Sequence, residues 1–474
     1  MGFISDLAAS TGQNEQALLL LVTLVCVFPI ALFHRFFLYR TNPTLQHVYG
    51  IVAGVALTSI VFGWYDMLVY AMSPSLVVYA LLFIFGPSST LSGAIFFSML
   101  TYLLSCYSVF SSEDYDINWT TAFCVMFLRI TSLVMDLSDG KLPEEKLSRD
   151  QKQFAVRRFP NLLEYLGFVW FYPAVLVGPT DNLSRYLAFT EGRLGGDDNG
   201  RVHSSSFGAA AITFGKTIFA AVLSTVLAAY FPSNLLITPE FEALPLPLRW
   251  LRCLPMGTAT FAKYCIAWGL TEVSCTLVGY SYNGTDKNGK MRWDQMNNVD
   301  VFGFLTYTSS HGVIDVFNKK TNDYLKRYIF KRVAFLGNKN LSMAIMAAFI
   351  SLWHGVHINY LIVFILCEVP MVIAERQFWP VFENLAGFTV WTAPGLLRYP
   401  LILLAWLYAH FFFTYGSVGM NVLQWNNLVQ SYKNIFFCCH IAMLMWFSTY
   451  ALLIPSRLKK SPQAAAAAAA AKKQ

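Results

Sequence analysis

His354 is the residue whose type and position most clearly suggest chemistry. It lies between two apolar stretches, in the segment SLWHGVH from Ser351 to His357. An ionisable side chain inside an apolar segment is costly and is by default a reason to expect a functional site. Trp353 adds a flat surface beside the imidazole, and Gly355 lets another chain or a substrate approach closely. The alternative is a histidine that only hydrogen-bonds a neighbouring helix.

A second histidine raises the question of a metal site. His357 lies three residues after His354, on roughly the same face of a helix. A metal site needs further ligands, and no carboxylate or cysteine lies nearby in sequence to supply them. We therefore expect no metal here. Of the other histidines, His410 and His440 also lie in apolar segments.

A basic and aromatic stretch precedes these histidines. It reads FNKKTNDYLKRYIFKR over residues 317–332. Nucleic acid is one conventional partner of such a pattern, but the stretch is short and lies between apolar segments, so we expect no nucleic-acid binding. Two interpretations stay open, a patch that binds anionic lipid and a site for a soluble substrate that carries phosphates. The candidates for phosphate contact are Lys326, Arg327, Lys331 and Arg332.

A third group of candidates lies in a polar region before that stretch. YNG at 282–284 contains an Asn-Gly turn, and WD follows at 293–294. Glu272 is an acid in an apolar segment and therefore needs a partner. These residues join Trp353 and Gly355 as candidates for substrate binding. They are Tyr282, Asn283, Trp293, Asp294 and Glu272.

The elements that must position these residues are membrane-spanning helices. Of the 474 residues, 56% are hydrophobic and only 13% are charged, whereas a soluble domain carries about 25% charged residues. A spanning helix needs about 20 mostly apolar residues. Because several runs are short, and Pro74 and Pro87 divide another, we predict an all-α, polytopic membrane protein with nine to twelve spans. The clear candidates are 17–37, 47–63, 91–110, 123–137, 162–177, 207–231, 261–279, 341–353, 356–375, 397–413 and 435–454.

The charged segments between the spans indicate orientation. The net charge is +7, and basic residues concentrate in the polar segments 138–160 and 318–340, which by the positive-inside rule face the cytoplasm. We expect no cleaved signal peptide and a first span that directs its own insertion. We divide the chain into N-terminal transmembrane helices (1–114), a core with cytoplasmic loops (115–456) and a basic cytoplasmic tail (457–474).

The order of five short motifs resembles that of the membrane-bound O-acyltransferases. An Asn and a His some tens of residues apart are the signature of that family, and here Asn318 and His354 stand 36 residues apart. The similarity extends from about Tyr115 to Ile454. The motifs are YNG (282–284), WD (293–294), FN (317–318), YIFKR (328–332) and WHG (353–355).

Longer segments are similar to one branch of that family, the lysophospholipid acyltransferases of the lysophosphatidylcholine type. They are residues 157–179, 327–342 and 352–355. The chain departs from the more usual FNxN pattern, because FNKK occupies 317–320. This departure leaves the substrate preference open.

The resemblance implies a fold, a reaction and a location. Transmembrane helices surround a buried chamber, where His354 is the general base and the Asn318 amide donates to the thioester carbonyl as negative charge develops. The substrates are acyl-CoA, which enters from the cytoplasm beside the basic stretch, and a lysophospholipid, whose free hydroxyl (sn-2) is acylated. No cofactor is required. The implied location is the endoplasmic reticulum membrane, in contact with membrane lipids, and a homodimer is compatible with the sequence.

Two kinds of alternative remain. Within the superfamily, a sterol, a diacylglycerol or a protein could be the acceptor, and the branch-specific segments argue against these. From another class, a transporter also has many spans and buried polar residues. A transporter has no need of the FN and WHG motifs at this spacing.

Overall fold

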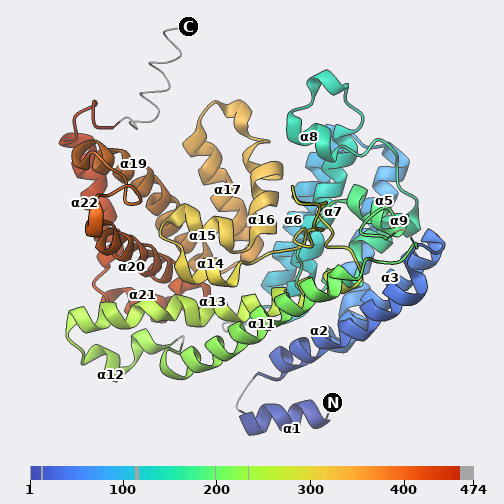
Figure 1. The fold of residues 1–474 in the computed structure, drawn as a ribbon, viewed down its shortest axis with the longest axis horizontal. Helices are drawn as coiled ribbons and strands as arrows, with labels where there is room; N and C mark the ends of the chain where they lie inside the picture. The colour runs from blue at the N-terminus through green and yellow to red at the C-terminus, as the bar shows by residue number, and fades with distance from the viewer. Residues whose placement is uncertain (1, 12–13, 113–116, 198, 233, 460–474) are drawn as a thin grey trace.

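The fold consists of helices joined by turns and loops, as a computed structural model of the chain shows (Figure 1). The structure describes residues 2–11, 14–112, 117–197, 199–232 and 234–459. Within these ranges no β-strand forms, and only isolated bridges pair extended residues. Among the described residues, eight helices are long and apolar enough to cross a membrane, or nine if a bent pair counts as one span. The prediction of an all-α polytopic protein is confirmed.

The eight candidate spans include several that change helix type along their length, such as η2 (Met67–Met72) followed by α5 (Ser73–Phe85). Their main helices are α2 (Glu15–Phe33), α3 (Pro43–Phe62), α5, α6 (Ser89–Phe110), α7 (Trp119–Asp139), α11 (Ser205–Tyr230), α19 (Val369–Ala386) with η8 (Ile362–Glu368), and α20 (Arg398–Ser417). The bent pair is α21 (Trp425–Asn434) and α22 (Cys438–Leu452), which meet at 68°.

Three expected spans are not among these helices, for identifiable reasons. The segment 162–177 breaks after α9 (Leu162–Val169) into a short 3₁₀ turn. The segment 341–353 belongs to α17 (Lys339–His354), whose 16 residues are too few to cross a bilayer. The segment 261–279 lies mostly in α13 (Leu246–Leu277), which also carries several charged side chains. Conversely, Pro74 does not divide its stretch: the helix is continuous from Met67 to Phe85, and the Tyr70 carbonyl, four residues before the proline that lacks an N–H, accepts from the Tyr102 hydroxyl at 2.8 Å.

The helices form an assembly with α7 near its centre. The long helices α11 and α13 pack along each other below α14 (Val301–Thr306) to α17 in the view of Figure 1, with α19, α20 and α22 at one end and α2, α3 and α9 at the other. Of the most apolar window of α7, 83% is buried. One continuous core joins residues from α2, α7 and α17, so helices on both sides of residue 114 share it. The predicted domain boundaries stay predictions, and residues 460–474 of the predicted tail lie outside the described ranges.

Arg129, at the middle of α7, explains how an irregular segment is tolerated in this core. It is only 3% exposed. Its guanidinium donates to the carbonyl oxygens of Val169 at 3.1 Å and Ala174 at 2.6 Å, in the segment where α9 ends. Backbone groups away from water need partners, and non-helical backbone at membrane depth is stable only when it is buried in protein. Arg129 supplies hydrogen-bond donors to two of the backbone carbonyl groups in this irregular segment.

Candidate active site

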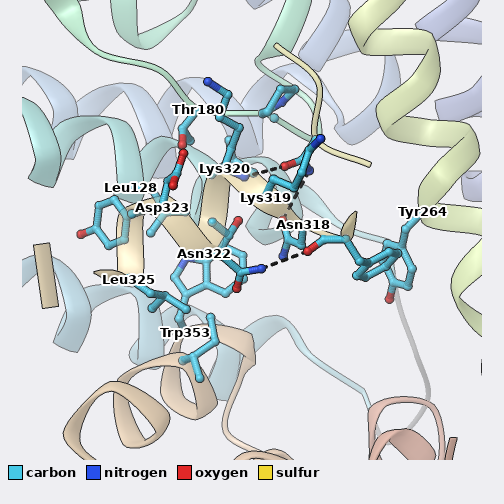
Figure 2. A pocket seen from close by; sticks show the side chains of 18 of the residues that line it. Leu128, Thr180, Tyr264, Asn318, Lys319, Lys320, Asn322, Asp323, Leu325 and Trp353 are labelled. Carbon is cyan, nitrogen blue, oxygen red and sulfur yellow. Dashed lines mark hydrogen bonds between the residues drawn. The ribbon is translucent and has the colours of Figure 1, made fainter. Parts of the chain in front are cut away.

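A cavity of about 1380 Å³ lies between α7, α13, α16 (Lys319–Tyr324), α17 and η8. Typical small-ligand pockets occupy about 300–1,000 Å³, so this chamber is larger than a typical small-ligand pocket. Both Asn318 and His354 line it. Figure 2 shows Asn318 with Lys319 and Lys320 at the start of α16, together with Trp353 from α17.

His354 is the last residue of α17, and its neighbours fix the end of that helix. The Trp353 indole Nε1 donates to the Cys124 carbonyl of α7 at 2.9 Å, and the Tyr107 hydroxyl of α6 donates to the Trp353 carbonyl at 2.8 Å. Gly355 has φ +147°, and a Cβ there would lie 2.9 Å from a ring carbon of Tyr360. The glycine of the WHG motif is therefore required for the chain to leave the helix at this point.

The imidazole of His354 is enclosed by aromatic rings. Phe364 stacks on it with ring centroids 5.2 Å apart, Tyr360 lies at 5.6 Å, and Trp353 meets it edge-on at 4.9 Å. Among the described residues, none hydrogen-bonds to its ring nitrogens. Rings that fix the imidazole without occupying its nitrogens leave those nitrogens available to a substrate in the chamber.

Asn318 occupies the position before α16 in an unusual backbone conformation. Its φ of 50° and ψ of 42° lie in the left-handed region, where asparagine is more readily accommodated than most residues. Its side chain makes no capping hydrogen bond to α16. Instead, its Oδ1 accepts from Nδ2 of Asn298 at 3.3 Å. Within the described ranges its own Nδ2 has no partner, which leaves a donor available in the chamber.

The basic stretch divides into two parts. Lys326 and Arg327 line the chamber, as do Lys319 and Lys320, and Lys320 Nζ lies 3.9 Å from Asp181 Oδ2. Two of the predicted phosphate contacts do not line it. Lys331 pairs with Asp150, and Arg332 Nη1 donates to Asp139 Oδ1 at 2.8 Å. These two cations fasten the segment after α16 to α8 (Arg149–Phe154) and to the end of α7.

The third group of candidates lies partly at the rim of the chamber and partly behind it. Asn283 and Asp294 line the chamber and hydrogen-bond each other at 2.8 Å. The other three do not line it. Tyr282 and Trp293 pack edge to face with centroids 5.5 Å apart, and the Trp293 Nε1 donates to Ser205. Glu272 has the partner it needs in Asn297, whose Nδ2 donates to Oε2 at 2.9 Å.

Two chamber residues were not anticipated from the sequence. Asn298 contacts Asn318, as described above, and nothing in its local sequence marks it. Glu368, in η8, lines the chamber and makes no ion pair within the described part of the chain. Glu368 could have been found by the argument that singled out Glu272, because it is an acid in an apolar run. His357 lines the chamber as well, with a buried Nε2 that has no partner among the described residues.

Comparison with known proteins identifies the family to which the chain belongs. Residues 104–418 match the MBOAT, membrane-bound O-acyltransferase, family. The chain is 33% identical to human "Lysophospholipid acyltransferase 5" over 446 residues, which cover 93% of this chain and 90% of that protein. It is 28% identical to the Caenorhabditis elegans protein of the same name, over 98% of this chain and 96% of the relative. It is also 25% identical to the Schizosaccharomyces pombe "Lysophospholipid acyltransferase", over 94% and 88% respectively. The family match, over residues 104–418, spans more than half of the chain and includes both Asn318 and His354. The protein therefore belongs to the membrane-bound O-acyltransferase family.

Proposed function

We propose that the protein transfers a fatty acyl chain from acyl-CoA to the free sn-2 hydroxyl of a lysophospholipid, in the endoplasmic reticulum membrane. The observation that carries this proposal is the single chamber lined by both Asn318 and His354. Support also comes from family membership and from relatives named as lysophospholipid acyltransferases that align over nearly the whole chain.

The proposed reaction needs a base and a donor, and the chamber offers one of each. His354 accepts the proton of the lysophospholipid hydroxyl while its oxygen attacks the thioester carbonyl carbon. The developing oxyanion accepts a hydrogen bond from the Asn318 amide. The carbon–sulfur bond then breaks, and the imidazolium returns its proton to the departing thiolate. The products are the diacyl phospholipid and free CoA, and the steps require no covalent enzyme intermediate.

The basic part of the chamber suits the CoA moiety of the donor. Lys326 and Arg327 line the chamber close in sequence to Asn318, and Lys319 follows Asn318 directly. A guanidinium can bind phosphate oxygens in bidentate fashion, and lysine acts as a point charge. CoA phosphates bound here would leave the pantetheine arm free to extend towards Asn318.

The acidic residue Glu368, which also lines the chamber, suits the acceptor lipid. Glu368 lies about one turn after Phe364 in η8, and Phe364 is the residue that stacks on His354. A carboxylate in an apolar span is costly unless it meets a positive charge. The quaternary ammonium of a phosphocholine head group supplies that charge next to the glycerol hydroxyl. We therefore propose a choline lysophospholipid as the preferred acceptor.

An acceptor panel tests this function. Membranes containing the protein are incubated with labelled acyl-CoA and, in parallel, with lysophosphatidylcholine, lysophosphatidylinositol, a sterol, a diacylglycerol and an acceptor peptide. We expect transfer to lysophosphatidylcholine above all others. In Glu368→Gln, transfer to lysophosphatidylcholine should fall several-fold while transfer to lysophosphatidylinositol should not. Label in sterol, diacylglycerol or peptide but not in lysophospholipid would contradict the proposal, and membrane fractionation tests the location.

A further inference from the structure

Asn298 is a buried asparagine that contacts the start of α16 through three hydrogen bonds. It is 2% exposed. Its backbone carbonyl accepts from the Lys319 N–H at 3.0 Å, and its side-chain Oδ1 accepts from the Lys320 N–H at 2.9 Å. Its Nδ2 donates to Oδ1 of Asn318 at 3.3 Å. Both ends of its amide are therefore in use, and all three bonds converge on residues 318–320.

The segment that carries Asn298 is itself fixed against the approach to Asn318. Val299 and Phe317 form an antiparallel bridge, and the Asp300 N–H donates to the Val316 carbonyl at 2.8 Å. Asn298 and Asn318 thus face each other across paired backbone. This pairing fixes where the Asn298 amide lies relative to the left-handed turn at Asn318.

The hydrogen bonds define the orientation of both amides. A backbone N–H can only donate, so the Lys320 N–H requires an oxygen at the Asn298 position it meets. The other end of the Asn298 amide is then the NH₂ group, which can only donate. The Asn318 atom that meets it must be the oxygen, because two NH₂ groups cannot bond each other. The NH₂ group of Asn318 is consequently directed away from Asn298.

We propose that Asn298 is a positioning residue that sets the amide orientation of Asn318, so that its NH₂ group and not its oxygen meets the thioester carbonyl. This inference rests on the proposed role of Asn318 as a donor. Without Asn298, the Asn318 amide is free to rotate by half a turn. The rotated Asn318 amide would present its oxygen to the developing oxyanion, and these two negatively polarised oxygens would repel each other.

Asn298→Asp tests the proposal with little change in shape. The aspartate still accepts from the Lys320 N–H but has lost the group that donates to Asn318. We expect kcat to fall about 10- to 100-fold, a smaller loss than that from removing an oxyanion donor outright, while the KM values for acyl-CoA and lysophospholipid stay near those of the parent protein. The buried carboxylate should lower the Tm somewhat. In an Asn318→Ala background, Asn298→Asp should lower kcat no further, since the residue it orients is gone.

The pH profile separates positioning from general damage. A protonated aspartic acid carries an O–H donor, which can again bond Oδ1 of Asn318. Relative to the parent protein, the activity of Asn298→Asp should therefore recover as the pH falls. Asn298→Ala has no titrating group, so its relative activity should not change with pH. The charged neighbours Lys319, Lys320 and Glu272 are the same in both variants and cancel in the comparison.

The outcomes distinguish this inference from the proposed function. Near-normal kcat in Asn298→Asp, additive losses in the double variant, or a flat relative pH profile would each overturn the positioning role. If Asn318→Ala itself keeps full activity, the donor role assigned to Asn318 fails, whatever Asn298 does. If Asn298→Asp does not fold, the double-variant comparison is made with Asn298→Ala, where additivity again overturns the proposal.

Discussion

The helices α16 and α17 each begin after an asparagine, and the two asparagines differ in backbone conformation and in hydrogen bonding. Asn338, before α17, is exposed and extended, and its Oδ1 accepts from the backbone N–H groups of Asn340 at 3.0 Å and Leu341 at 3.1 Å. Asn318, before α16, is left-handed, makes no capping bond and lines the chamber. An asparagine cap contributes about 0.5–2 kcal/mol relative to alanine. Asn318 gives up that contribution, and a residue in a sparsely populated conformation is characteristic of functional sites.

The largest effect is expected at His354, which sets the scale for both asparagines. His354→Ala removes the proposed base, and a positioned base contributes about 10²–10⁴-fold. Labelled acyl transfer should be nearly abolished, with normal protein levels in membranes. His357→Ala, which removes the second histidine of the chamber, should cause a much smaller loss. Full activity in His354→Ala would refute the mechanism.

The comparison of the asparagines is tested directly by the same substitution at both sites. Aspartate caps a helix as well as asparagine but has no NH₂ group to donate. Asn318→Asp should lower kcat by about 10²–10³-fold, the usual effect of losing an oxyanion donor. Asn338→Asp should leave kcat and Tm nearly unchanged and is the matched control. If Asn318→Asp keeps most of its activity, its assignment as a donor is wrong.

A similar division within the basic stretch predicts an intermediate effect. Neutralising Lys326 and Arg327 with glutamine should raise the KM for acyl-CoA about tenfold, as expected if about 1.4 kcal/mol of phosphate binding is lost. The KM for lysophospholipid should stay constant, and Arg327→Lys should be a partial loss. Neutralising Lys331 and Arg332 should instead lower Tm, because it leaves Asp139 and Asp150 without their partners. Equal changes in both KM values would indicate general damage.

The smallest effects concern stability. Asn338→Ala removes a cap and should cost about 1 kcal/mol with little change in kcat. Asn318→Gly removes no cap and relieves a left-handed backbone, but it also removes the acceptor of the buried Asn298 Nδ2, so thermal stability should change little while activity is lost. Thermal unfolding in detergent, measured beside acyl transfer, checks both. A Tm that falls more for Asn318→Gly than for Asn338→Ala would show that Asn318 is structural.

The sequence predicts this architecture well where a property is local. Apolar runs reveal most spans, and an ionisable residue in such a run reveals His354 without reference to any family. The role of Asn318 follows only from resemblance, since nothing local separates it from Asn338. The pairing of Arg332 with Asp139, 193 residues apart in the chain, could not be foreseen. Nor could the contact of Asn298 with Asn318, because both depend on how distant segments pack.

Arg129 has a consequence for how the protein is made. An arginine at the middle of a single apolar helix costs about 2.5–3.5 kcal/mol on insertion scales, and α7 carries one at its midpoint. The carbonyl groups that accept from it lie about 40 residues later in the chain, at the last residue of α9 and in the turn that follows it. We therefore expect α7 to gain stability in the bilayer once that later segment has been synthesised and packs against it. On this argument, α7 and the segment around the end of α9 stabilise each other during biogenesis and not each by itself.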